Sequence, residues 1–201
     1  MANPFELVHE FERQVAKYTG SPFATATDSC SHAIFLSSIY CKKNHNEVTI
    51  PKNTYISIPM QLIHAGYKLN FVDKDWKGYY YIEPTPIIDA APRFTENMYI
   101  PGTYTCVSFQ FHKILSTNRG GMILTDDEDF YKWSQSAVHD GRNMGVPYNV
   151  DNISILGYHM FMPPETAETG LAKLQILPKY NEDVAGSYTY HDISYIGNFT
   201  R

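Results

Sequence analysis

The sequence lacks the features that place a protein in a membrane or on nucleic acid. Among its 201 residues no apolar run approaches the length of a membrane-spanning helix, which needs about 20 such residues. No block of basic residues is present and the net charge is −5, so nothing draws the chain to nucleic acid. The first seven residues carry neither the basic segment nor the apolar segment of a secretory signal.

Cysteine is also scarce. The three cysteines, Cys30, Cys41 and Cys106, are odd in number and lie far apart in the sequence. They have none of the spacings that metal ligands show, so we expect no metal site. Because an odd, scattered set does not form a disulfide framework, the sequence predicts reduced thiols and a cytoplasmic location.

What the sequence does contain is typical of a globular protein. Hydrophobic residues make up 43% of the chain and charged residues 18%. The length suits one domain and is sufficient to bury a core. The 16 Tyr and 11 Phe residues are many for this size. Aromatic residues at this density usually fill cores and subunit interfaces, so they indicate packing rather than a special site.

Hydrophobic periodicity divides the chain into alternating helices and strands. Strands are expected at 23–27, 48–50, 69–72, 87–89, 105–109 and 122–125, and helices at 5–18, 30–43, 55–65, 127–138 and 164–177. This alternation predicts an α/β fold with a mostly parallel sheet flanked by helices. We expect residues 1–178 to form this domain and residues 179–201 to form a short tail. In such sheets ligands bind at the carboxyl ends of the strands.

Lys113 is the first candidate for chemistry. It lies just after a predicted strand and before Gly120-Gly121, in mostly apolar surroundings. Partial desolvation in such a place favours the neutral, nucleophilic amine. The competing interpretation is a solvated surface lysine, which is far commoner.

Two further segments carry polar groups at strand ends. Asp89 follows Ile87-Ile88 and precedes two alanines, so it is either a turn residue or a carboxylate that keeps a heterocyclic nitrogen protonated. The segment from Asp28 to Ala33 joins a strand to a helix. Its backbone N–H groups and the Ser31 hydroxyl can bind an anion, although simple capping of the helix is commoner.

Taken together, these segments resemble the DegT/DnrJ/StrS family of sugar aminotransferases, which have fold type I and bind pyridoxal 5′-phosphate (PLP). Asp89-Ala-Ala resembles one family motif, and Ser108-Phe followed by four residues and Lys113 resembles another. Five further segments match in the family's order: 11–20, 28–34, 51–55, 120–125 and 157–162. The resemblance covers roughly residues 8 to 177, and seven motifs in the correct order are difficult to obtain by chance.

The resemblance implies a role for each matching residue. Lys113 carries the Schiff base with PLP and later acts as a general acid and base, and Asp89 pairs with the pyridinium nitrogen. Tyr55 stacks on the cofactor ring. Ser31 and Ser108, with the amides near Cys30, hold the phosphate. His159 completes the phosphate site of the partner subunit, which implies a homodimer with shared active sites. The reaction that the resemblance implies is amino-group transfer from an amino acid to a ketone, with a nucleotide-linked keto-sugar as the ketone.

The sequence also departs from the family pattern. We expect most of the C-terminal domain that usually follows the segment 164–177 to be missing, and the stretch between Tyr55 and Asp89 to lack a strand and a helix. His159 replaces an Asn, Phe161 replaces an Arg near the substrate, and Arg119 stands where an acidic residue is common. These differences keep two alternatives open. One is a different PLP enzyme, such as a lyase or racemase, and the other is a non-catalytic remnant that binds PLP.

Overall fold

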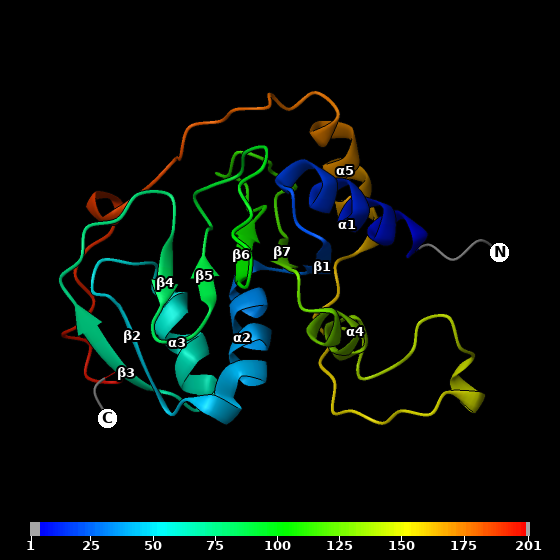
Figure 1. Ribbon diagram of the computed structural model, residues 1–201, viewed down its shortest axis with the longest axis horizontal. Coiled ribbons are helices and arrows are strands. Elements are labelled where there is room, and N and C mark those ends of the chain that lie inside the picture. The colour runs from blue at the N-terminus through cyan, green and yellow to red at the C-terminus, as the bar shows by residue number, and fades with distance from the viewer. Residues whose placement is uncertain (1–4, 200–201) are drawn as a thin grey trace.

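The computed structural model describes residues 5–199 and has five α-helices and seven strands within that range (Figure 1). The first four residues of the predicted domain and the last two of the predicted tail lie outside it. The helices are α1 (Glu6–Thr19), α2 (Cys30–Cys41), α3 (Ser57–His64), α4 (Glu128–Ala137) and α5 (Pro164–Leu174). The strands are β1 (Phe23–Thr27), β2 (Glu47–Pro51), β3 (Lys68–Val72), β4 (Tyr80–Ile82), β5 (Ile87–Asp89), β6 (Tyr104–Ser108) and β7 (Gly121–Thr125). The expected helices and strands are all present, with ends that shift by a few residues.

The main sheet is mixed, so the prediction of a mostly parallel sheet was wrong. Within the described residues its order is β1-β7-β6-β5-β4, and of the four neighbouring pairs β5–β6 is parallel while the other three are antiparallel. The connections explain this result. A parallel connection needs a crossover of a dozen or more residues, usually through a helix. Residues 83–86 between β4 and β5 are too few for one, and residues 109–120 between β6 and β7 contain no helix.

Strand β4 was not predicted. It contains three residues, and the run Tyr79-Tyr80-Tyr81 shows no contrast between apolar and polar positions from which a strand could be recognised. β4 lies between β5 and β2: Thr49 in β2 and Glu83 just after β4 exchange backbone hydrogen bonds of 2.7 and 3.1 Å. β4 therefore links the main sheet to the parallel pair β2–β3.

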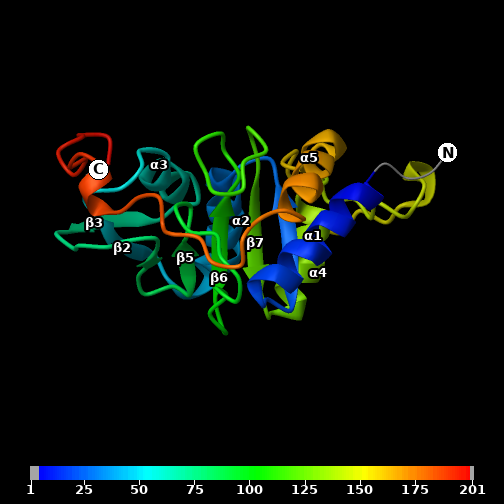
Figure 2. The ribbon, with the colours of Figure 1, turned by 90° about the horizontal axis from the view of Figure 1, so that it is seen from above.

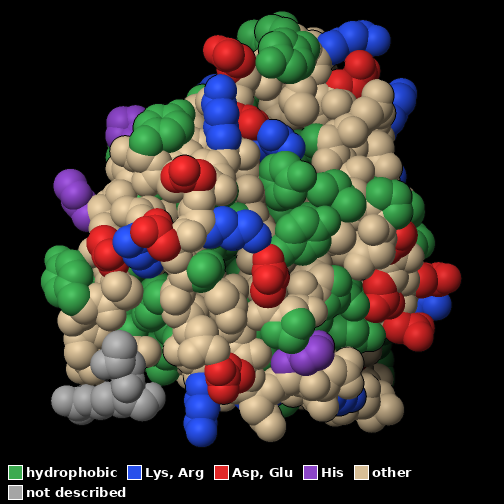
Figure 3. Space-filling view, turned by 60° about the vertical axis from the view of Figure 1, so that its left-hand side comes forward, with side chains coloured by type: hydrophobic (Ala, Val, Ile, Leu, Met, Phe, Trp, Pro, Cys, Tyr) green, Lys and Arg blue, Asp and Glu red, His purple; other side chains and the backbone are tan. Residues whose placement is uncertain are grey.

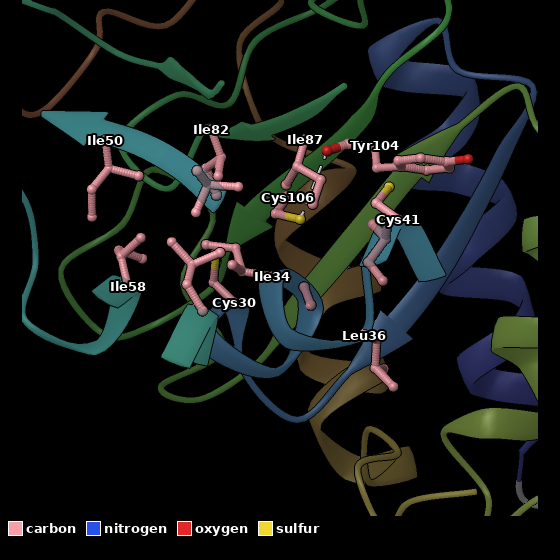
Figure 4. Close-up of a cluster of buried hydrophobic side chains, with 14 of the residues drawn as sticks. Cys30, Ile34, Leu36, Cys41, Ile50, Ile58, Ile82, Ile87, Tyr104 and Cys106 are labelled. Carbon is pink, nitrogen blue, oxygen red and sulfur yellow. Dashed lines mark hydrogen bonds between the residues drawn. The ribbon is translucent and has the colours of Figure 1, made fainter. Parts of the chain in front are cut away.

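Two hydrophobic clusters cover the two faces of the main sheet. One contains residues of α2, α3 and α4 together with Ile87, Cys106 and Ile123. Figure 4 shows part of it, with Cys30 and Ile34 of α2 facing Ile82, Ile87 and Cys106 of the sheet. The other cluster packs α1 and α5 against the opposite face. Every residue of β6 and β7 is buried, so these central strands form a rigid platform whose ends position the site.

The segment after α5 does not leave the domain. It runs back over the main sheet from α5 towards β3, as Figures 1 and 2 show in orange and red. Backbone hydrogen bonds hold it: Val184 donates to Pro92 at 3.0 Å, Gly78 donates to Ala185 at 3.0 Å and Ile193 donates to Lys52 at 3.0 Å. The predicted tail is therefore a strap that passes the carboxyl ends of β5 and β6.

The surface combines charged and hydrophobic groups. On the side that carries β2, β3 and the C-terminus, hydrophobic side chains are exposed between acidic and basic ones (Figure 3). The three cysteines are free and buried. Within residues 5–199 no helix is both long enough and apolar enough to cross a bilayer.

Candidate functional site

A cavity of about 420 Å³ opens at the carboxyl ends of β5 and β6. Its walls come from the loop between β1 and α2, the segment between β2 and α3, the loop between β6 and β7, and the strap. Six of the seven predicted site residues line it: Cys30, Ser31, Tyr55, Asp89, Ser108 and Lys113. The fold thus brings together residues that lie up to 83 positions apart in the sequence, from Cys30 to Lys113.

Asp89 forms the buried floor of the cavity. Its side chain is only 3% exposed, and both of its carboxylate oxygens accept a hydrogen bond. The backbone N–H of Ala91 donates to Oδ1 at 3.0 Å, and the Tyr80 hydroxyl donates to Oδ2 at 2.7 Å. Burial raises the pKa of Asp89, while these two hydrogen bonds and the charge of Lys113 act in the opposite direction. A buried carboxylate with this support suits a cationic partner in the cavity.

Lys113 comes from the loop that joins β6 to β7. Hydrogen bonds across the base of this loop, from Phe109 N to Gly120 O and from Thr117 N to Phe109 O, are each 2.9 Å long. Within the loop, Lys113 N donates to Gln110 O at 2.9 Å and closes a turn. Lys113 lines the cavity together with Asp89 and Cys30, and its positive charge offsets a small part of the rise in pKa that burial causes at both groups. The amine and the carboxylate therefore face the same cavity.

The first turn of α2 forms a second wall. Ser29 caps the helix by accepting a hydrogen bond from His32 N at 3.2 Å, and the Ser31 hydroxyl lies 2.8 Å from that of Ser57. Gly121 in β7 permits this arrangement, because a Cβ there would lie 2.4 Å from Cys30 N. Burial raises the pKa of the Cys30 thiol well above its ordinary value, so the thiol stays neutral beside the helix N-terminus.

Asp28 connects this turn to the opposite loop. Its Oδ1 lies 2.5 Å from Nδ1 of His32, and its Oδ2 accepts a hydrogen bond of 2.7 Å from Arg119. Burial works to raise the pKa of Asp28, but His32 and Arg119 together bring the pKa below its ordinary value. Arg119 also lines the cavity, so a cation stands at the mouth beside the α2 N-terminus.

An aromatic wall was only partly predicted. Tyr55 is 56% exposed, and its ring centroid lies 6.4 Å from that of Tyr190 in the strap. Tyr190 in turn stacks on Trp76 at 5.8 Å. Burial, with the negative charge of Asp89, raises the pKa of Tyr190 to about 12. The sequence gave no pattern for Trp76 or Tyr190, because neither follows a strand end or a known motif.

His159 lies outside the cavity. It is an exposed residue, and its Nδ1 lies 2.9 Å from Oδ2 of Asp140. An isolated bridge pairs it with His139, and its ring contacts Phe161 edge to face. The single chain therefore leaves His159 on the surface, at the end of the projecting segment 140–158 that Figure 1 shows in yellow.

Comparisons with known proteins agree with this arrangement. The model of the DegT/DnrJ/EryC1/StrS aminotransferase family matches residues 2–98 and 100–190. No sequence among the curated proteins matches the chain.

Several solved structures share the fold at low sequence identity. The sugar aminotransferase CalS13 from Micromonospora echinospora has a TM-score of 0.71 at 15% identity, over 85% of this chain and 60% of that one. The PLP form of the sugar aminotransferase Spr1654 from Streptococcus pneumoniae, which its name describes as putative, has a TM-score of 0.68 at 19% identity, over 86% and 59%. GDP-4-keto-6-deoxymannose-3-dehydratase (ColD) has a TM-score of 0.68 at 19% identity, over 86% and 61%.

The chain thus spans about three fifths of the length of these solved proteins. The family model covers most of the sequence, and the matching positions include the strand ends, the loop with Lys113 and the turn before α2. On this evidence the chain belongs to the DegT/DnrJ/EryC1/StrS aminotransferase family.

Proposed function

We propose that the chain is a PLP-dependent aminotransferase that moves an amino group from an amino acid to a ketone, with Lys113 as the residue that binds the cofactor covalently. The observation that carries the proposal is that Lys113 and Asp89 face one cavity, with Tyr55 and the α2 N-terminus on its walls. Family membership supports it. The likeness to structures of Spr1654 in PLP and PMP forms supports the choice of cofactor.

The residues present fit this cofactor. PLP combines an aldehyde, a basic ring nitrogen and a phosphate on a flat ring. Lys113 offers an amine for the aldehyde, Asp89 a buried carboxylate for the nitrogen, and Tyr55 a ring with an open face. Ser31 and Ser108 offer hydroxyls, and the N–H groups of the first turn of α2 favour a phosphate. When bound, PLP supplies an electron sink for the electrons released at the substrate Cα.

Residues of the chain would bind the cofactor, transfer the proton and shield the cavity. Lys113 would hold the cofactor through its amine, and the same amine, once free, would accept the proton from the donor's Cα. Asp89 stabilises positive charge on the ring nitrogen because its carboxylate is buried and cannot be screened by water. The strap and the aromatic wall line the cavity, and Asp89 at its floor is only 3% exposed, so few water molecules would reach it.

We propose a nucleotide-linked keto-sugar as the ketone, since the similar structures include sugar aminotransferases. A second candidate is a different reaction on the same PLP-binding core. The similarity to ColD, whose name describes a dehydratase, favours it. Phe161 also favours it, since it stands where family members carry an arginine near the substrate.

Assembly is the third part of the proposal. We propose a cytoplasmic homodimer in which His159 reaches the phosphate of the partner subunit. The support is the position of His159 outside its own cavity and the apolar character of the projecting segment. Its exposed hydrophobic residues are Val146, Tyr148, Val150, Ile153 and Leu156. Exposed apolar side chains gathered on one segment are typical of a protein interface.

Half-reaction spectroscopy tests the proposed function. The protein is saturated with PLP and mixed with a panel of amino donors in the absence of a ketone. An aminotransferase shifts the absorption from the band of lysine-bound PLP to that of pyridoxamine 5′-phosphate. A lyase or racemase changes the donor without that shift. No covalent binding of PLP at all would overturn the proposal.

A further inference from the structure

Tyr80 connects the unpredicted strand β4 to the floor of the cavity. Its side chain is 2% exposed, and its ring centroid lies 4.8 Å from that of Trp76. Its hydroxyl donates to Oδ2 of Asp89 at 2.7 Å, and the Thr54 hydroxyl lies 2.5 Å from the same phenol oxygen. Because the single phenol proton goes to Asp89, Thr54 must be the donor in the second contact. The three side chains thus form a continuous chain of hydrogen bonds that ends on the carboxylate.

The register of the sheet produces this contact. β4 and β5 are antiparallel, and Tyr80 is paired directly with Asp89. Side chains at paired positions project from the same face, so the phenol and the carboxylate meet on the cavity side. Tyr81 projects from the other face of β4 and packs against the cluster that contains α1 and α5. The chain therefore offers two adjacent tyrosines of which only Tyr80 is placed to contact Asp89.

We propose that Tyr80 is a positioning residue, which acts with Thr54 to hold the Asp89 carboxylate in a fixed plane and in its charged form at the floor of the cavity. This inference rests on the proposed function, because the charge matters for a ring nitrogen bound there. A buried carboxylate without donors is destabilised as an anion, and a hydrogen bond to the charged form offsets part of that cost. With Ala91 N–H on one oxygen and Tyr80 on the other, the carboxylate cannot rotate without breaking both contacts.

Few of the titratable groups around Asp89 can stabilise its charged form. The titratable groups whose electrostatic influence reaches Asp89 come from β4, α2, β6, the loop after β6 and the strap; they are Tyr80, Cys30, Cys106, Lys113 and Tyr190. Burial raises the pKa of both thiols and of both phenols, so all four stay neutral at physiological pH. Lys113 is then the cation of this set, and it must give up its proton to react. Tyr80 keeps its donor in place whether or not Lys113 is charged.

Titration of Asp89 in the cofactor-free protein tests the inference without any activity assay. The carboxyl carbon of aspartate is labelled with ¹³C, and the Asp89 signal is identified by its absence in Asp89→Asn protein. We expect Tyr80→Phe to increase the proton affinity of Asp89 by about tenfold or more, since hydrogen bonds to charged groups contribute about 1.5–3 kcal/mol. Tyr81→Phe, the matched control on the same strand, leaves the titration unchanged. Thr54→Val shifts it in the same direction as Tyr80→Phe by a smaller amount.

The outcomes separate this inference from the proposed function. An Asp89 titration in Tyr80→Phe that equals that of the wild type overturns the role of Tyr80, whatever the protein does with PLP. If circular dichroism shows that Tyr80→Phe is unfolded, the Thr54→Val variant is used in its place. An Asp89 titration in Thr54→Val that equals that of the wild type then overturns the role proposed for Tyr80. Failure of the wild type to bind PLP covalently overturns the proposed function but not the effect of Tyr80 on Asp89. When PLP does bind, Tyr80→Phe weakens it and Tyr81→Phe does not.

Discussion

The cavity and the projecting segment 140–158 are built in opposite ways. Asp89 and Ser108 are buried at the ends of packed strands, and each is held by the sheet of its own chain. His159, at the end of the projecting segment, is exposed and contacts little more than Asp140 and its neighbouring rings. Residues of the first region can work within one subunit, whereas the role proposed for His159 requires the surface of a second subunit. Substitutions in the two regions should therefore fail in different ways.

The largest effect is expected from Lys113→Ala. Loss of the amine removes both the covalent attachment and the proton acceptor, and general acid–base catalysis alone contributes about 10²- to 10⁴-fold. We expect turnover to fall by at least about a thousandfold while the unfolding transition stays in place, because the half-buried side chain lines a cavity and is not packed in the core. Lys132→Ala on the exposed face of α4 is the control. Comparable turnover in the two variants would exclude Lys113 from the chemistry.

The next effect concerns the junction between the two regions. His139 is 6% exposed and stacks on Phe161, and burial, with the charge of His9, lowers the pKa of its ring to about 4. The unfolded chain therefore binds a proton at His139 more readily than the folded chain does. The contribution of neutral His139 to the free energy of unfolding is complete above pH 6.5, the ordinary pKa of histidine, and is lost as the pH falls towards 4. The loss is about 3 kcal/mol.

Chemical denaturation between pH 7.5 and 4.5 measures this effect. We expect the free energy of unfolding of the wild type to fall relative to that of His139→Phe, which keeps the stacked ring but cannot titrate. His64→Gln, at the exposed end of α3, is the control for the removal of a histidine. Parallel pH profiles for the wild type and His139→Phe would show that His139 does not bring about the dependence.

Asp89→Asn should affect function and stability in opposite directions. Loss of a charged hydrogen-bond partner for the ring nitrogen costs about 10- to 100-fold in turnover. The pKa of Asp89 is raised by burial, so in the cofactor-free protein its contribution to stability decreases as the pH rises through that pKa. We therefore expect Asp89→Asn to be the more stable protein at pH 7 without PLP. If Asp89→Asn and the wild type have equal turnover and equal melting temperatures, Asp89 is only a turn residue.

His159→Ala should have the smallest effect, and one that depends on assembly. We expect PLP affinity to fall by about five- to tenfold, the value of one hydrogen bond, with the fold of each subunit intact. Mixing this variant with Lys113→Ala protein sharpens the test when PLP is kept at a concentration that leaves the His159→Ala sites mostly empty. If sites are shared, a re-equilibrated heterodimer contains one site with both lesions and one with neither, and activity rises above that of the two variants measured separately. If light scattering shows a monomer, or if mixing restores no activity, His159 does not contribute to the site of a partner subunit and its role is limited to its contact with Asp140.

The residues in and around the cavity differ in how far the sequence could predict them. Lys113, Asp89 and Ser108 were predicted because each follows a strand at a spacing that matches a family motif. Tyr80, Trp76 and Tyr190 were missed since they reach the cavity through the register of a three-residue strand and the path of the strap. Such positions depend on tertiary packing, which leaves no local periodicity. The parallel sheet was wrong for a related reason, because strand direction depends on the length of the connections.

Covalent trapping of PLP is the most direct test of the account. The protein is saturated with PLP, reduced with borohydride, digested, and mapped by mass spectrometry. We predict that the label lies on Lys113, and that Lys132→Ala protein is labelled to the same extent as the wild type while Lys113→Ala protein is not. A label on another lysine, or no label in the wild type, would contradict the account.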